Sequence, residues 1–265
     1  MASTQLKEKK ETLPVNFMSE LSEFAGEGLE SIGADDMQIP FLRIMQTTSP
    51  QLNKQESVYI KGASGGDLFN TVTGQFWDSD EGVYVIPCGY TLKYLEFQLR
   101  TEGGGFMGEI KATDPVLTQT TRDSSTELLP SGNELIRSAQ HLVMIVDVNT
   151  GATQSAICDM KKTQLKVSKR WNTMMKMVQY SGPNGLFNPP MWAQPWRLTS
   201  VQQSNDQGKW FNYQLNQDVL PIDSVPVSAQ EEAKELYNRF KSGEIKTGTG
   251  EETSSSNMKD EDLPF

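Results

Sequence analysis

The sequence has few of the residues that build metal centres and disulfide frameworks. Its 265 residues include one histidine, His141, and two cysteines, Cys88 and Cys158. A structural zinc site of the usual kind needs four Cys or His ligands, which this chain cannot supply. Both cysteines lie in apolar, strand-like stretches. This context favours buried reduced thiols in a cytosol over a disulfide between them.

Long hydrophobic runs and signal-like segments are also missing. No run of eighteen apolar residues occurs, so the sequence predicts no membrane-spanning helix. The N-terminal lysines are not followed by the apolar segment of a secretory signal. We therefore expect a cytoplasmic protein, acting in the host cytoplasm if it is viral.

Catalytic motifs are scarce as well. The pattern HExxH is absent, and the glycine-rich stretch 103–108 lacks the Gly-Lys-Ser/Thr ending of a phosphate-binding loop. We expect no enzymatic activity, no metal site and no cofactor. Two acidic turns, one with Asp35 and Asp36 and one over 78–81, leave a Mg²⁺-dependent nuclease as an alternative.

The net charge of −10 is concentrated at the two ends of the chain. Residues 1–36 carry eight acidic residues against three lysines, and residues 251–265 carry five against one. The middle is nearly neutral, so the low isoelectric point does not exclude a nucleic-acid partner. We predict a flexible acidic N-terminal arm over 1–36, a folded domain over 37–243 and a disordered acidic tail over 244–265.

The apolar pattern of the middle region predicts a mainly β domain with helical additions. The longest strand-like stretch is 83–100, in which Pro87 predicts a bend, a bulge or an edge position. Two hairpins and two helices are expected after it, in the segments 141–160, 161–178, 192–216 and 228–243. This order predicts an OB-like antiparallel barrel with insertions. A β-sandwich is the alternative.

The helix expected over 161–178 has one apolar and one basic face. Trp171 lies in the apolar stripe, which predicts a core position for it. Five cations fall near the opposite side of the helix: Lys162, Lys166, Lys169, Arg170 and Lys176. Solvated faces usually mix both signs, and like charges repel one another. The basic face therefore favours contact with phosphates.

Aromatic and basic residues alternate near the end of the long strand-like stretch. Lys93, Tyr94 and Phe97 lie within it, and Arg100 closes it. Neither face of the stretch is purely apolar, which suits a strand partly exposed to a ligand. Rings that stack on bases and cations that contact phosphates form platforms for single strands. These four residues are candidates for that role, and a core position is the alternative for the two rings.

The chain ends in a short acidic and apolar peptide. A terminal phenylalanine gains nothing unless another surface buries it, and proline restricts the backbone before it. The α-carboxylate adds a charge that basic side chains can bind. We predict that this tip is bound by a partner protein through Asp260, Glu261, Asp262, Leu263, Pro264 and Phe265.

In this context the sequence resembles single-stranded DNA-binding proteins. Bacterial members end in an acidic run followed by Ile-Pro-Phe, and Leu263 here replaces the isoleucine. The segments GDLFNTVTG, GVYVIPCGY and TQLKVSKRWNTMM look like a phage-encoded single-stranded DNA-binding protein. The resemblance implies an OB-fold core that coats and protects single strands without sequence specificity during DNA replication, recombination and repair. It also implies recruitment of a polymerase, helicase or nuclease through the tip. Whether the chain forms a homo-oligomer stays open.

Two further classes of protein fit the same features. A recombination protein that anneals complementary strands would share the DNA-binding groove and form large rings or filaments. A phage structural or interaction protein would use its acidic ends only to stay dissolved, and it would have no need of the basic helix.

Overall fold

The structure is a computed structural model that describes residues 15–33, 38–206, 208–216 and 219–249. The chain divides into two units, Met1–Gln38 and Ile39–Phe265. In the first, the helix α1 (Val15–Glu23) is described. No helix in the described residues is both long and apolar enough to cross a membrane.

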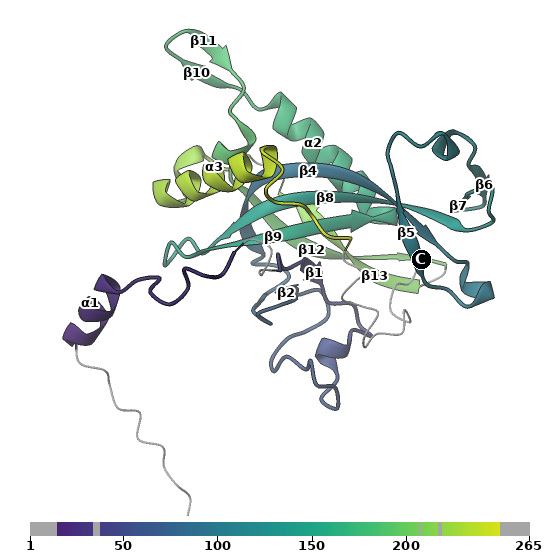
Figure 1. The fold of residues 1–265 in the computed structure, drawn as a ribbon, viewed down its shortest axis with the longest axis horizontal. Coiled ribbons are helices and arrows are strands. Elements are labelled where there is room, and N and C mark those ends of the chain that lie inside the picture. The colour runs from purple at the N-terminus through teal and green to yellow at the C-terminus, as the bar shows by residue number, and fades with distance from the viewer. Residues whose placement is uncertain (1–14, 34–37, 207, 217–218, 250–265) are drawn as a thin grey trace, which may run out of the picture. The chain divides into compact units, whose positions relative to one another are not determined.

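The second unit is mainly β, as predicted (Figure 1). Its described helices are α2 (Leu165–Met177) and α3 (Val227–Lys241). Its described strands are β1 (Leu42–Ile44), β2 (Leu68–Asn70), β3 (Phe76–Trp77), β4 (Val83–Phe97), β5 (Phe106–Ile110), β6 (Thr121–Asp123), β7 (Thr126–Leu128), β8 (Glu134–Val146), β9 (Thr153–Lys161), β10 (Tyr180–Gly182), β11 (Gly185–Phe187), β12 (Trp196–Asn205) and β13 (Gly208–Leu215).

One large antiparallel sheet carries the fold. Its strands run in the order β13-β12-β4-β8-β7-β6, with β5 paired to β4 and β9 paired to β8. Smaller sheets are formed by β1-β2-β3 and by β10-β11. Both predicted hairpins are present, as β8-β9 and β12-β13. The stretch 101–134 contains the short strands β5, β6 and β7, which pair with β4, with β8 and with each other.

A bulge interrupts the longest strand where proline occurs. The register between β4 and β8 shifts between Pro87 and Gly89. Proline has no N–H to donate to the ladder, so a bulge is one of the few places that a strand accepts it. This confirms the disruption predicted at Pro87.

The large sheet is buried on both faces, and each face has its own hydrophobic core. On the face that we call inner, Val85, Ile145 and Leu198 pack against one side of α2. The outer face packs residues such as Ile86, Leu142 and Ile157 against α3. Cys158 belongs to the inner core and Cys88 to the outer core, and both are free and buried. Burial raises the pKa of each thiol to about 12, as expected for inert structural cysteines.

The described strands do not close into a barrel. The path β9-β8-β4-β12-β13 curls around the inner core, but no described ladder joins β9 to β13. The edge of β9 is instead used by Phe41, which forms a bridge with Ile157. Side chains span the remaining gap, since the Tyr213 hydroxyl donates to the Leu42 carbonyl at 2.5 Å and the Gln46 amide exchanges two hydrogen bonds with the backbone of Phe211. The predicted barrel is therefore open, and the OB fold itself is not established.

The helix expected over 228–243 is α3, which spans Val227–Lys241 and has no side-chain cap, although Ser228 and Glu231 match the pattern of a capping box. The segment after this helix differs from its prediction. Residues 245–249, which fall in the segment predicted to be a disordered tail, lie against the outer face of the sheet. We call this segment the strap. Its residues alternate between buried and exposed, with Ile245, Thr247 and Thr249 buried.

Candidate nucleic-acid interface

The helix α2 is fixed to the body by its apolar stripe. Trp171 is fully buried, as predicted, and its ring stacks on His141 with 4.5 Å between centroids. Ser168 is also buried, with its hydroxyl 2.8 Å from Nε2 of His141. At the other end, the Asn188 side-chain amide donates to the carbonyl oxygens of Lys176 and Val178 at 2.8 Å each. These contacts hold one face of α2 inward and leave the opposite face to solvent.

The exposed face of α2 is basic. Lys166, Lys169, Arg170 and Lys176 are all exposed, and none of them forms an ion pair with a described residue. The fifth predicted cation behaves differently, because Lys162 precedes the helix and its Nζ lies 3.3 Å from a carboxylate oxygen of Glu134. Four uncompensated cations on three turns of helix attract a polyanion and repel one another without one.

A shallow groove of about 310 Å³ runs between this helix and the second hairpin. The helix contributes two of the four cations, and the strands contribute amide and apolar side chains. The residues that line the groove are Lys166, Val167, Arg170, Val201, Gln203, Tyr213, Gln214 and Leu215. A groove with cations on one wall and neutral side chains on the other can hold a phosphate backbone beside less polar groups.

The candidates on β4 are not gathered on one exposed platform. Phe97 is only 8% exposed and packs against Phe106 with ring centroids 5.5 Å apart. Lys93 is buried, and its Nζ contacts Glu109 at 3.0 Å. Tyr94 is half-buried below the guanidinium of Arg137, which lies 6.0 Å from its ring centroid. Arg100 is exposed after the end of β4.

One exposed aromatic that the sequence reasoning did not single out lies beyond the end of α2. The hairpin β10-β11 projects from the body there (Figure 1). Phe187 is 46% exposed and Leu186 is 69% exposed. Asn188, which follows Phe187 directly, binds the carbonyl of Lys176. The hairpin therefore places a partly exposed ring close to the basic face. Its signal in the sequence is an aromatic residue within the stretch 181–190, whose prolines and glycines are typical of a loop.

Other predicted functional residues have no catalytic geometry in the described chain. The carboxylate of Asp78 accepts the backbone N–H groups of Asp80 and Glu81, which makes it a turn residue. Asp35 and Asp36 lie outside the described residues. The described part of the chain contains no group of three or more His, Cys, Asp or Glu residues that could hold a metal ion. The predicted partner-binding tip, 260–265, also lies outside the described residues.

Comparison with known proteins gives one match. The family model described as Pam3 phage gp34-like protein matches residues 8–246. No curated protein and no solved structure matches the chain significantly. The matched residues include α2 and β12-β13, and the match places the chain among bacteriophage proteins. The chain belongs to the family of Pam3 phage gp34-like proteins.

Proposed function

We propose that this phage protein binds single-stranded DNA without sequence specificity and protects it in the host cytoplasm during replication or recombination. The observation that carries the proposal is the set of four exposed cations on α2 without an ion-pair partner among the described residues, two of which, Lys166 and Arg170, line the groove against β12-β13. Contacts to phosphates from cations of this kind are independent of base sequence.

A single strand fits this surface better than a duplex. The groove wall on β12-β13 has amide and apolar side chains but no cation, so it offers no second row of phosphate contacts. An unpaired strand has one row of phosphates and leaves its bases free to stack. The exposed ring of Phe187, beside the basic end of α2, supplies one stacking surface, and Tyr94 is a second candidate.

Partner recruitment is the second part of the proposal. The sequence of the tip, three acids followed by Leu263, Pro264 and Phe265, fits an apolar pocket with a basic rim on a polymerase, helicase or nuclease. The body is nearly neutral and binds DNA through α2, whereas the tip is acidic. DNA binding and partner binding therefore use separate parts of the chain.

Charge reversal on α2 tests the DNA-binding role. In the full-length double variant Lys166→Glu/Lys169→Glu, affinity for labelled oligo(dT) at low salt should fall by at least about tenfold. Two lost phosphate contacts should also reduce the slope of log K against log salt by about 1.4. Fluorescence anisotropy across a salt series measures both quantities.

The matched control is Lys54→Glu/Lys61→Glu. These two lysines are also exposed, and their reversal changes the net charge by the same amount at a distance in sequence from α2. The control should keep most of the affinity and nearly the original slope. Equal losses in both variants would mean that only net charge matters, and would overturn the assignment of α2 as the interface.

A further inference from the structure

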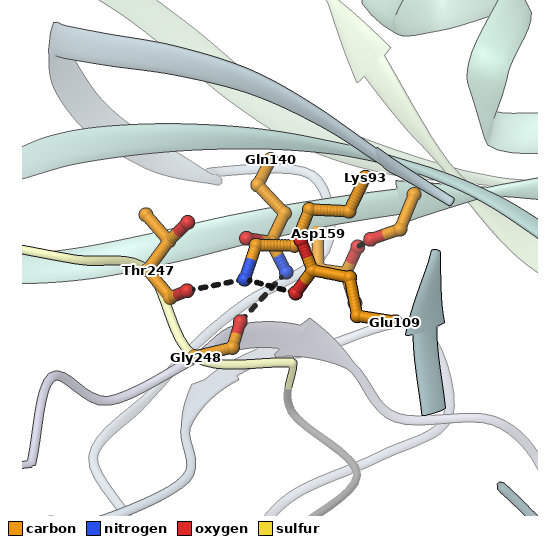
Figure 2. Close-up of polar contacts among 7 residues, drawn as sticks. Lys93, Glu109, Gln140, Asp159, Thr247 and Gly248 are labelled. Atoms are coloured by element: carbon orange, nitrogen blue, oxygen red, sulfur yellow. Dashed lines mark hydrogen bonds and ion pairs between the residues drawn. The ribbon is translucent and has the colours of Figure 1, made fainter. Parts of the chain in front are cut away.

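The strap lies across a polar part of the outer face, where two side chains hold it by its backbone (Figure 2). Lys93 Nζ donates to the carbonyl oxygen of Thr247 at 2.5 Å, and Gln140 Nε2 donates to that of Gly248 at 3.0 Å. Two neighbouring carbonyls are thus bound by two strands of the large sheet. Between 246 and 249 the backbone belongs to no described strand ladder.

The outer face is divided into an apolar and a polar half. The half below α3 is apolar, like an ordinary hydrophobic core. The half below the strap consists of Lys93, Ser138, Gln140 and Asp159, all nearly inaccessible to solvent. Such groups are stable in water as well. Contact with these polar residues therefore stabilises the docked strap only a little.

The strap leaves hydrogen-bonding capacity unused. Gln140 is fully buried, yet its Oε1 atom has no partner among the described residues, and the same is true of the Thr249 hydroxyl. Buried polar atoms without partners are unfavourable. A ligand or water that reached Gln140 after the strap had left would satisfy its Oε1 atom.

The strap is held by few interactions. Ile245 is its one buried aliphatic side chain, and two hydrogen bonds bind its carbonyls. Ordering five backbone residues costs conformational entropy. This cost is similar in size to the free energy gained from the apolar contact and the two hydrogen bonds. The closed and released states are therefore close in free energy. The turn at Gly243, whose φ of +80° suits glycine, separates the strap from α3.

The covered surface and the basic helix are connected along the chain through β9. Lys93, Ser138 and Lys161 face one another across β4, β8 and β9. Lys161 ends β9, and α2 begins four residues later.

We propose that the strap is a displaceable cover over a second segment of the DNA-binding surface. This proposal rests on the proposed function. Single-stranded DNA displaces the strap, a phosphate replaces the Thr247 carbonyl at Lys93, and a base edge bonds Gln140. Binding at this surface and strap docking then exclude each other, so the closed strap lowers the apparent affinity for DNA.

The first measurement uses the unmodified full chain. Hydrogen–deuterium exchange of the peptide covering 244–249 should increase when the protein is saturated with oligo(dT), because bound DNA holds the strap open. Unchanged or slower exchange in the DNA complex would overturn the proposal. This measurement needs no variant and so does not depend on how a substitution folds.

The second measurement compares two full-length variants. Ile245→Asn removes the apolar contact of the strap, and Gly248→Asn introduces the same residue at an exposed strap position with open space around it. The first should bind oligo(dT) about three- to tenfold more tightly than the unmodified chain, and the second should bind as the unmodified chain does.

The outcomes separate the two proposals. If the unmodified chain binds DNA and Ile245→Asn has faster strap exchange but the same affinity, the cover is refuted and the proposed function stands. If Ile245→Asn changes only the oligomeric state in light scattering, the surface holds a protein segment and the cover is again refuted. If the unmodified chain does not bind DNA in dilute buffer, the proposed function itself fails.

Discussion

His141, the one histidine of the chain, is a core residue between two aromatic rings. Its ring centroid lies 5.0 Å from that of Tyr90 and 4.5 Å from that of Trp171. Its Nδ1 atom has no partner among the described residues. Burial favours the neutral ring and lowers the pKa of His141 from 6.5 to about 3.

The lowered pKa of His141 predicts that the protein loses stability in mild acid. Because the folded pKa lies below the unfolded one, the stabilisation from neutral His141 is complete above pH 6.5 and is lost as the pH falls toward 3. The free energy of unfolding should fall by up to about 1.4 kcal/mol per pH unit over this window. Urea unfolding at pH 7, 6 and 5 measures it. H141Q should show a flatter dependence, and identical profiles for both chains would contradict the assignment.

At the scale of elements, the bulge of β4 brings strand and helix into direct contact. A Cβ atom added at Gly89 would lie 2.5 Å from Cδ1 of the Phe240 ring on α3. Since no other residue type lacks this atom, glycine lets α3 approach the outer face closely. The contact supports the apolar half of that face, and α3 leads directly into the strap.

G89A should therefore lower the free energy of unfolding by about 1–3 kcal/mol through overpacking. The penalty should largely disappear when Phe240 is also replaced by alanine, because the ring that causes the clash is gone. Urea unfolding of the four chains of this double-mutant cycle measures the coupling. An equal penalty in both backgrounds would show that the strain at Gly89 has another source.

Local patterns predicted much of the element structure. The two hairpins and two helices of the body follow periodicity and turn residues, and Pro87 marked the bulge. The position of Lys93 could not be predicted, because its partners Glu109 and Thr247 come from segments that local sequence does not connect to it. The strap shows the same limit, since the alternation of Ile245, Thr247 and Thr249 lies in a polar stretch typical of disorder.

At the scale of the molecule, charge is separated by sign. The acidic excess lies in residues 1–36 and 251–265, while the body is close to neutral and α2 presents a row of exposed cations. The sequence was sufficient to find the basic helix, because five cations recur on one helical face. It could not show that Lys162 is paired or that Lys166 and Arg170 line a groove, since both depend on contacts with other strands.

The most direct test of DNA binding is a titration of the full chain with oligo(dT) across a salt series, followed by the fluorescence of its five tryptophans. Four phosphate contacts from α2 predict tight binding in dilute buffer and a slope of log K against log salt of about −3. A duplex of equal length should bind more weakly. No association with the homopolymer at the lowest salt concentration would contradict the account.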